Sequence, residues 1–506
     1  MSAGRQAPRL PLGWAVLVAV MASLPLFVVK YPPIQDLPFH LAAMRVIHSY
    51  GDPAFGFQND LVLRLGSTQY VLYYLLGSLL AYGLGIVKAN LVLMCAYTGG
   101  SVLAMRALLR ALGRDERLCI AVVPLLYNVM FLFGLLPFLV GIPVMLWGIA
   151  VAVRYFEAPS VGRGVLLAFL ATSLFYLHVF PFALFGLAFA VMFPWRRPKG
   201  WFVAGLPTLP ALAVAAWWTW LTPEGRLAQG ALTHPEVPSK LSPLGKILDA
   251  YNWFGDVYRD LSDEAILGTL GGVVLLSAVL ASRRLAGESQ GAPRPGLWRY
   301  AAVPGACFVL MLVTGEQHGH IWLIWQRFPL LLLLTVIPLA RMPGGRAGTA
   351  ITASLVVLAA VSTVTACVHW VRFERDDVGD FDEALRAMEP RSRVAGLVFD
   401  KVSSVVHRHP LVHFVSYYQL ERGGVVEYTF AGYPHWPFTF RPDRAPPEGA
   451  PARLNWEWTP ERVTSEELYP YFDYVLTRGD GFAPTSGTYH LSWQGHRWNV
   501  WQRDAR

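Results

Sequence analysis

The 506-residue sequence has little charge and few cysteines. Only 15% of its residues are Asp, Glu, Lys or Arg, against roughly 25% in soluble globular chains. The four cysteines all fall in apolar segments, which excludes a disulfide scaffold and gives no sign of a cysteine-based metal site. No glycine-rich phosphate loop, nucleotide fingerprint or internal repeat is present. With a mean hydropathy of +0.39, the chain cannot be one ordinary soluble domain.

The sequence instead contains apolar blocks of roughly 16 to 25 residues, the length that crosses a hydrocarbon core about 30 Å thick. The strands of an outer-membrane barrel would alternate apolar and polar residues over about 10 positions, and these blocks do not. The predicted fold class is therefore an all-α polytopic membrane bundle. The blocks are 12–29, 68–87, 89–109, 118–133, 138–155, 164–178, 180–194, 201–221, 265–281, 299–314, 321–340 and 348–371.

Arginine-bearing loops decide how these blocks are threaded, because cytoplasmic loops carry an excess of Lys and Arg. If all twelve blocks crossed, every such loop after Arg106 would lie outside. Removing one crossing before Arg106 places them all inside, and the best candidate is the Tyr- and Gly-rich block 68–87. We therefore predict eleven crossings of the cell membrane, a cytoplasmic N-terminus, and two juxtamembrane helices in an external loop, 30–88. A second external loop is 222–264, and demotion of 89–109 is the alternative.

From Arg372 onward the composition changes. The first 371 residues hold 26 Lys and Arg against 15 acids, whereas the remainder holds 16 against 19. The cations of the first part lie between apolar blocks, where they indicate topology and contacts with lipid headgroups, and no nucleic-acid partner. Short alternating runs in the remainder predict a helix at 380–388 and several strands. We expect a transmembrane domain, 1–371, and a small extracytoplasmic α/β domain, 372–506.

The segment YPPIQDLPFHLAAMRVIH, residues 31–48, follows the first apolar block and contains Asp36. A carboxylate held at the edge of the membrane could act as a general base or a metal ligand. The alternative is a helix cap, since Pro38 suits the first turn of a helix that Asp36 would precede. His40 lies one helical turn beyond Asp36 and could share its site.

A second cluster, EQHGHIWLIWQR, contains Glu316, His318, His320 and Arg327 on the same external side. We expect Arg327 about two turns inside an apolar run, and an intramembrane arginine marks a functional site by default. Its planar guanidinium suits a phosphate, although a headgroup or a carboxylate could equally pair with it.

Two further groups of histidines stand out. His178 interrupts the apolar run 164–194 on the external side and is either an interhelical hydrogen-bonding residue or part of the same site. The run His407, His409 and His413 has no nearby cysteine, and we interpret it as surface and strand residues. Three separate loops thus place ionisable groups on one face of the membrane.

The order of these features resembles the GT-C glycosyltransferases, which include protein O-mannosyltransferases and lipid A aminoarabinose transferases. The features are one apolar helix, an external loop that begins with an acid (IQDLPFH), two juxtamembrane helices, an arginine-ended second helix (AMRALLRALGRDER) and an external C-terminal domain. The resemblance implies that Asp36 acts as catalytic base or helps to bind a metal. It also implies that Arg327, with His318 or His320, holds the phosphate of a polyprenyl carrier.

Two departures from the family pattern bear on the chemistry. Asp36 is followed by Leu37 where many members have a second acid, and residues 133–138 (FGLLPF) contain no acid where many members carry another. These departures argue against a tightly bound divalent metal, so no cofactor is predicted and catalysis is left to Asp36.

The sequence therefore predicts an integral membrane glycosyltransferase. It would move a hexosyl or pentosyl group from a polyprenyl-phosphate-linked donor to an extracytoplasmic glycan, lipid or protein. Asp36 is the predicted base, and the predicted substrate-binding residues are His40, His178, Glu316, His318, His320 and Arg327. Two alternatives stay open: a non-catalytic GT-C-like protein that binds or translocates a lipid-linked glycan, and a polysaccharide polymerase or ligase.

Overall fold

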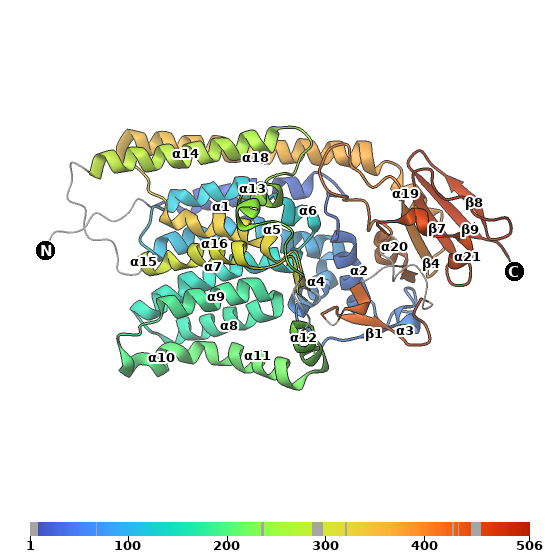
Figure 1. Ribbon diagram of the computed structural model, residues 1–506, viewed down its shortest axis with the longest axis horizontal. Coiled ribbons are helices and arrows are strands. Elements are labelled where there is room, and N and C mark those ends of the chain that lie inside the picture. The colour runs from blue at the N-terminus through green and yellow to red at the C-terminus, as the bar shows by residue number, and fades with distance from the viewer. Residues whose placement is uncertain are drawn as a thin grey trace. The chain divides into compact units, whose positions relative to one another are not determined.

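The computed structural model describes residues 9–66, 68–233, 237–285, 297–318, 321–427, 430–433, 435–446 and 457–505 (Figure 1). The chain divides into two compact units. The first contains the residues up to Val28, Leu93–Phe131 and Leu136–Val368. The second contains Val29–Val92, Leu132–Leu135 and the residues from His369 onward.

The first unit is almost entirely helical, and α5 and α18 each continue from one unit into the other. Its α-helices are α1 (Leu12–Ser23), α5 (Ile86–Ala111), α6 (Val129–Phe133), α7 (Leu136–Glu157), α8 (Val161–Leu177), α9 (Val179–Met192), α10 (Trp201–Gly205), α11 (Leu209–Leu221), α12 (Pro223–Thr233), α13 (Pro243–Phe254), α14 (Ser262–Leu285), α15 (Leu297–Tyr300), α16 (Ala302–Val313), α17 (Phe328–Val336) and α18 (Gly345–Phe373). Its 3-10 helices are η1 (Leu24–Phe27), η2 (Glu116–Leu125), η3 (Pro198–Gly200), η4 (Leu206–Thr208), η5 (Trp325–Arg327) and η6 (Ile337–Leu339). A short antiparallel pair, β2 (Gln317–His318) and β3 (Ile321–Trp322), completes it.

Apolar helices of this length indicate a membrane protein. Within the described ranges, five are long and apolar enough to cross a membrane, and they are Ile86–Ala111, Leu136–Glu157, Pro198–Leu221, Ser262–Ser282 and Gly345–Val378. Shorter apolar helices are Leu12–Phe27, Val71–Leu84, Val161–Leu177, Val179–Met192, Leu297–Val313 and Trp325–Leu339. The block 68–87 is thus an apolar helix like several others, and the count of eleven crossings stays a prediction.

Helix α7 lies at the centre of one helical layer, where it packs against α8 and α9 (Figure 1). It is the most buried of the five long apolar helices. A small residue permits the approach: a Cβ added to Gly141 would lie 2.8 Å from Cγ of Pro181 in α9. Small residues at helix contacts are how apolar helices come close to one another in a membrane.

The predicted crossing 118–133 is not one continuous helix. The 3-10 helix η2 contains Pro124, which has no N–H to donate, and a separate helix, α6, begins at Val129. Between them the buried Asn128 donates to the carbonyls of Leu125 and Leu126 and accepts from Phe131 N–H. Pro124 therefore removes a regular helical hydrogen bond, and the Asn128 side chain supplies others. The length of an apolar block does not reveal such a break.

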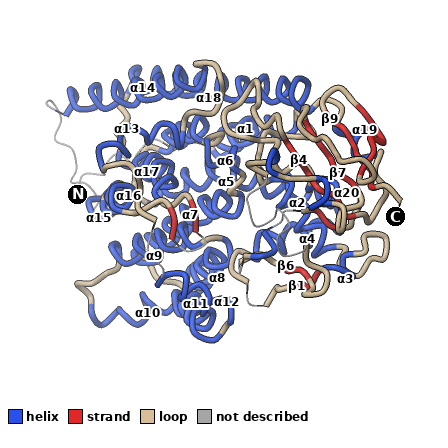
Figure 2. The backbone as a smooth tube through the Cα atoms, turned by 45° about the vertical axis from the view of Figure 1, so that its right-hand side comes forward, coloured by secondary structure: helices blue, strands red, loops and turns tan. Residues whose placement is uncertain are grey.

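The second unit combines the loop 30–88, which we predict to be external, with the C-terminal residues. Its helices are α2 (Leu37–His48), α3 (Phe57–Asp60), α4 (Val71–Leu84), the π-helix η7 (Glu374–Val378), α19 (Phe381–Arg386), α20 (Ser416–Arg422), η8 (Phe430–Gly432), η10 (Pro460–Arg462) and α21 (Ser465–Leu468). Its strands, red in Figure 2, are β1 (Leu61–Leu63), β4 (Arg393–Val398), β5 (Val425–Val426), β6 (Phe438–Phe440), β7 (Tyr474–Arg478), β8 (Tyr489–Gln494) and β9 (Trp498–Arg503).

Five strands form a mixed sheet in the order β5-β4-β7-β9-β8. Strands β5, β4 and β7 run parallel, and β9 and β8 continue the sheet antiparallel. The central strand β7 is buried along its whole length, whereas most of the edge strand β8 is exposed. A core of Leu397, Leu468 and Phe472 lies against this sheet. Parallel central strands need cover on both faces, which explains their continuous apolar runs in the sequence.

Three sets of contacts hold the first loop and the C-terminal residues together within this unit. Strand β1 pairs with β6, so that Leu61 lies opposite Phe440. Helix α2 packs on α20, and Arg45 Nε donates to the carbonyl of Leu420 at 3.1 Å. Lys30 Nζ lies 2.7 Å from a carboxylate oxygen of Asp382. These contacts join residues more than 300 positions apart and bring C-terminal side chains beside Asp36.

Candidate active site

Asp36 lies where three short segments of the second unit meet. Its backbone N–H donates to the carbonyl of Phe133 at 3.2 Å, and the preceding Gln35 N–H donates to Leu132 at 2.8 Å. Helix α2 begins immediately afterwards, with Pro38 in its first turn. The Asp36 side chain makes no capping hydrogen bond to that helix. Asp36 therefore occupies the N-cap position, as the helix-cap alternative expects, but its carboxylate does not cap the helix.

The carboxylate of Asp36 instead pairs with His413. The His413 Nδ1–H donates to Oδ1 of Asp36 at 2.9 Å, across 377 positions of sequence. The imidazole is 5% exposed and the Asp36 side chain 13% exposed. The ring of Phe39 lies 4.2 Å from the His413 ring, centroid to centroid, at an angle of 30°. Because both ring packing and the hydrogen bond fix the imidazole, His413 in turn fixes the orientation of the carboxylate.

The two oxygens of the Asp36 carboxylate have different surroundings. Among the described residues, both of its hydrogen bonds fall on Oδ1, the second being a long contact of 3.5 Å from Gln35 Nε2. Oδ2 is therefore the oxygen available to take a proton from another molecule. This asymmetry is the geometry that a general base requires, with one oxygen held and the other open.

Gly134 lies against Asp36 and belongs to the segment 133–138, which contains no acid. Its φ of +83° belongs to the left-handed region, and an added Cβ would lie 2.9 Å from Asp36 N and 3.0 Å from Asp36 Cβ. Only glycine satisfies both conditions without strain. Residue 134 therefore supports the Asp36 backbone through close packing instead of adding a second carboxylate.

His40 holds the same glycine from the other side. Its Nε2–H donates to the carbonyl of Gly134 at 2.8 Å, and its Nδ1 accepts from the Tyr74 hydroxyl at 2.9 Å. Burial lowers the pKa of His40, against the opposing effect of the Asp36 charge. Both nitrogens of this neutral imidazole are engaged by protein groups, so the arrangement positions Gly134, and a direct contact of His40 with substrate stays a prediction.

Two buried glutamates, which the sequence did not single out, lie in the same unit. Glu427 is 3% exposed, and its Oε2 accepts from Gly396 N–H at 2.9 Å. Burial raises the pKa of Glu427 well above its usual range. Burial also raises the pKa of Glu457, with His413 opposing the rise and Asp36 adding to it. Glu457 therefore lies close enough to Asp36 and His413 to interact with their charges, and Glu427 interacts with Glu457.

The other predicted site residues lie in the first unit, and two of them are in contact. Arg327 NH1 donates to Nε2 of His178 at 2.8 Å, while Nε and NH2 donate to the carbonyls of Leu323 and Trp322. The rings of Phe138 and Phe180 lie 5.4 and 4.9 Å from the guanidinium carbon. These contacts, from an imidazole, two carbonyls and two phenyl rings, hold the guanidinium in place.

The apolar run that contains Arg327 is not helical before Trp325, so Arg327 does not lie two helical turns inside it. The 3-10 helix η5 starts at Trp325, and Arg327 stands immediately before Phe328, the first residue of α17. The residues before Trp325 form strand β3 and a turn. A positive charge at a helix N-terminus is disfavoured by the helix dipole, so the cation–π and carbonyl contacts must compensate for it.

The contact of Arg327 with His178 determines the protonation of the imidazole. A guanidinium can only donate, so Nε2 of His178 must accept and the ring must be neutral. Phe180 N–H also approaches Nδ1 of His178, at 3.2 Å. Because a neutral imidazole accepts at one nitrogen only, we give precedence to the shorter contact with Arg327.

The remaining members of the second cluster have other surroundings. Oε1 of Glu316 accepts from Ser239 Oγ at 3.3 Å and from Lys240 N–H at 3.4 Å. His318 lies in β2, opposite Ile321 of β3. His320 lies outside the described residues. Asp36 and Arg327 belong to different units, so a single cavity that contains both stays a prediction.

The side chains around Asp36 do not fit a divalent metal. Hard cations such as magnesium take several oxygen ligands, and one oxygen of this single carboxylate is already bonded to an imidazole N–H. Within the described ranges, no three His, Cys, Asp or Glu side chains gather as a metal-binding group. No step of the chemistry below depends on a metal.

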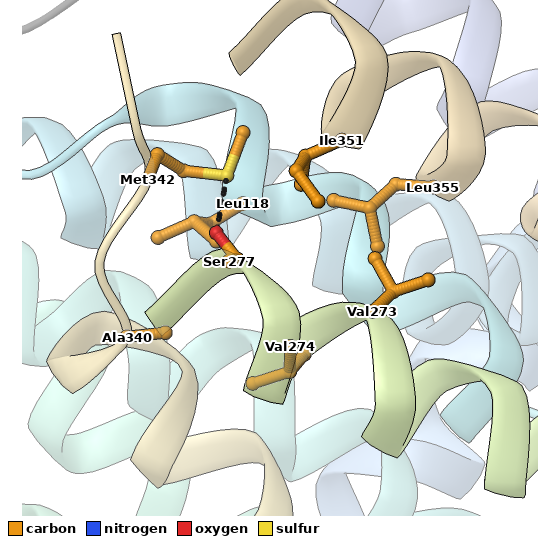
Figure 3. Close-up of a pocket in the computed structure, with 8 residues that line it drawn as sticks. All are labelled: Leu118, Val273, Val274, Ser277, Ala340, Met342, Ile351 and Leu355. Atoms are coloured by element: carbon orange, nitrogen blue, oxygen red, sulfur yellow. Dashed lines mark hydrogen bonds between the residues drawn. The ribbon is translucent and has the colours of Figure 1, made fainter. Parts of the chain in front are cut away.

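A pocket in the first unit contrasts with this polar site. Figure 3 shows eight residues from η2, α14, α18 and the segment before α18, and the labelled hydrogen bond joins Ser277 Oγ to Met342 Sδ at 3.5 Å. None of the eight is ionisable. The pocket therefore lacks groups for acid–base chemistry.

The interpretation of His413 as a surface residue is wrong. It is 4% exposed and contacts the one carboxylate that the sequence singled out. The local run of histidines does not indicate this contact, and the buried glutamates belong to no local motif, so only the pairing of distant segments reveals them.

Comparisons with known proteins support the fold. No family model matches the chain, and no curated protein does. Among solved structures, the chain is similar to a cryo-electron-microscopy structure of arabinofuranosyltransferase AftD from mycobacteria, with 14% sequence identity and a TM-score of 0.50. The match covers 99% of this chain and 42% of AftD, so this chain spans less than half the length of AftD. At this identity the likeness shows a shared fold only.

Proposed function

We propose that the chain is an integral membrane glycosyltransferase that moves a sugar from a polyprenyl-phosphate-linked donor to an extracytoplasmic acceptor. The observation that carries the proposal is the Asp36 carboxylate, held through Oδ1 by a buried imidazole and still 13% exposed. The likeness to an arabinofuranosyltransferase and the order of loops and helices that resembles the GT-C glycosyltransferases support the same class.

In the proposed reaction, Oδ2 of Asp36 takes the proton of an acceptor hydroxyl. The acceptor oxygen forms a bond to the anomeric carbon while the bond from that carbon to the phosphate oxygen breaks, and the bonding electrons leave with the polyprenyl phosphate. The attack from the opposite side inverts the configuration of the sugar. Since phosphate is a good leaving group, placing the acceptor against the base supplies most of the required rate.

His413 acts in this scheme as a positioning residue. Its Nδ1–H keeps Oδ1 engaged before and after Oδ2 receives the proton, so the carboxylate does not rotate between turnovers. The imidazole itself is not required to exchange a proton with substrate.

We assign Arg327 to the donor phosphate. Its planar guanidinium suits a phosphate, and hydrogen bonds to His178 and to the carbonyl of Trp322 fix its orientation. An Arg327→Lys variant should raise the KM for a polyprenyl-phosphate sugar about tenfold or more, because an ammonium group lacks the bidentate fork. An unchanged KM would remove Arg327 from the donor site.

The direct test is transfer from decaprenyl-phosphate arabinose and decaprenyl-phosphate mannose by the full chain in lipid nanodiscs. The Asp36→Asn variant should lose transfer about 100- to 10,000-fold, the usual contribution of a general base. Asp52→Asn is the matched control, because Asp52 is an exposed acid of the same external loop whose Oδ1 accepts from Ala54 N–H. Full activity in folded Asp36→Asn would refute the base assignment.

The same assay separates the alternatives. A wild-type chain that binds both donors and transfers neither sugar in a single turnover would be a non-catalytic lipid-glycan binder. Transfer of a glycan block from a polyprenyl-diphosphate donor would instead identify a polymerase or ligase.

A further inference from the structure

A continuous series of aromatic rings in the second unit starts beside the Asp36–His413 pair. From His413 it passes to Phe39 at 4.2 Å, to Phe430 at 4.8 Å and to Tyr433 at 5.8 Å, centroid to centroid. Tyr433 stacks on His435 at 5.6 Å and 22°, and His435 meets Tyr70 at 5.5 Å. We call the five rings beyond His413 the ring path; it consists of Phe39, Phe430, Tyr433, His435 and Tyr70.

The ring path changes in character along its length. Its inner ring, Phe39, is 2% exposed and purely apolar. Its outer rings, Tyr433, His435 and Tyr70, are half-buried, and each carries a polar atom on its edge. Partly exposed rings that carry a hydrogen-bonding group suit a ligand that is apolar on one side and polar around its rim.

A buried donor lies beside the ring path. The indole of Trp436 lies 5.0 Å from the Phe430 ring and 5.3 Å from the Tyr74 ring. Trp436 is 2% exposed, and its Nε1–H has no acceptor among the described residues. A buried N–H without an acceptor is unfavourable in the protein alone, so it points to an oxygen supplied from outside.

Tyr70 is also held in an unusual conformation. It precedes α4 with a φ of +67°, a left-handed value that bulky residues rarely adopt. A glycine or asparagine would relieve this strain but would remove the ring from His435. Retained strain of this kind is found where a side chain must be placed for a purpose.

Resting on the proposed function, we propose that the ring path is the acceptor subsite and that the acceptor is a carbohydrate. The half-buried faces of Tyr433, His435 and Tyr70 stack on sugar rings, and their polar edges and Trp436 Nε1–H meet sugar hydroxyls. The chain of contacts through Phe430 and Phe39 then leads the reacting hydroxyl toward Asp36. An isoprenoid tail would be better matched by walls without polar edges, so the ring path is assigned to the acceptor and not to the donor lipid.

The experiment measures binding of two neutral probes to the full chain in nanodiscs, the methyl glycosides of a linear arabinofuranose trisaccharide and of mannotriose, by saturation-transfer NMR and calorimetry. At least one probe should bind saturably. Tyr433→Ala and His435→Ala should each weaken that binding about 2- to 10-fold, the range expected for one aromatic stacking contact. Tyr433→Phe, which keeps the ring and loses the hydroxyl, should weaken binding less than Tyr433→Ala does.

The matched control is His490→Ala, which removes the same kind of ring from β8 of the same unit, away from the ring path. His490→Ala should bind the trisaccharides as the wild type does. Absence of saturable trisaccharide binding would overturn the proposal. Loss of decaprenyl-phosphate binding, instead of trisaccharide binding, in Tyr433→Ala would also overturn it. Unimpaired transfer in Asp36→Asn would refute the base assignment and leave the ring path intact, so the two failures can be distinguished.

Discussion

Each of the two units contains a buried histidine that is hydrogen-bonded to an ionisable side chain, and the two ionisable side chains have opposite charges. In the second unit His413 donates to the carboxylate of Asp36, and in the first unit His178 accepts from the guanidinium of Arg327. His413 can make its contact whether neutral or protonated, whereas His178 can make its contact only when neutral. The first pair therefore tolerates proton transfer, and the second holds a fixed positive charge.

Both pairs are buried. Asp36 is 9% exposed and Arg327 is 6% exposed, and the guanidinium of Arg327 also lies near two phenyl rings. Histidine thus contacts a carboxylate when it donates and a guanidinium when it accepts.

The largest effect is expected from removing the hydrogen bond that His413 donates to Asp36. His413→Phe keeps the ring against Phe39 but removes the N–H, so Oδ1 of Asp36 loses its donor. We expect transfer to fall about 100-fold, the loss typical of a misplaced reacting group. His413→Asn places an amide N–H near the position of Nδ1 and should recover activity to within about tenfold of the wild type.

The pH profile distinguishes this positioning role from a structural one. If His413 only positions Asp36, the Asn variant keeps the shape of the wild-type profile and lowers its height. A profile whose acid limb disappears in His413→Asn would show that His413 itself exchanges protons and would contradict the scheme.

The next largest effect is expected from removing the hydrogen bond between Arg327 and His178. His178→Leu removes the acceptor of Arg327 NH1 and should lower the free energy of unfolding by about 1.5–3 kcal/mol, the usual contribution of a hydrogen bond to a charged group. His178→Gln can offer an oxygen near the position of Nε2 and should restore most of that loss. Thermal unfolding in detergent, followed by tryptophan fluorescence, measures both, and equal stability of the two variants would contradict the assignment.

Much of the fold could be predicted from the sequence, because apolar length and two-residue alternation are local properties. The apolar blocks around α5, α7 and α14 are helices, and the runs at 393–400 and 489–502 are strands. The break in the predicted helix 118–133 was not predicted, because one asparagine, Asn128, has little effect on the mean hydropathy of the block. Its side chain nevertheless takes the place of backbone hydrogen bonds.

The site was predicted only in part. Asp36 stands in a recognisable segment, but His413 is 377 positions away, and no periodicity connects the two. The acid that many members of the resembled family carry near residue 134 is replaced here by a glycine whose importance lies in its φ angle. Contacts between distant segments depend on tertiary packing, so a motif search leaves them out.

A smaller effect tests whether Gly134 keeps the Asp36 pair in place. Gly134→Ala introduces a Cβ 2.9 Å from Asp36 N and requires a left-handed alanine. The conformational strain alone costs about 1–2 kcal/mol, and the displaced carboxylate should reduce transfer as well as stability. Gly83→Ala is the control, because Gly83 in α4 has open space around its Cβ position and no positive φ. Equal melting temperatures for the two variants would show that the 134 loop does not support the site.

The smallest expected effect concerns Glu427 of the second unit and tests whether its buried carboxyl group keeps its proton at neutral pH. Glu427 has a folded-state pKa raised by burial, so below pH 4.5 it is protonated both folded and unfolded and does not alter stability. As the pH rises above that value, only the unfolded chain releases the proton, and the free energy of unfolding falls by at most about 1.4 kcal/mol per pH unit until the folded pKa is reached. Glu427→Gln keeps an acceptor for Gly396 N–H and cannot ionise, so its melting temperature should match the wild type near pH 4 and exceed it at pH 8.

The matched control is the exposed Glu466, whose pKa is lowered by a hydrogen bond from Thr485. The melting temperature of Glu466→Gln, relative to the wild type, should fall as the pH rises. A pH-independent difference between Glu427→Gln and the wild type would mean that Glu427 is ionised in the folded chain.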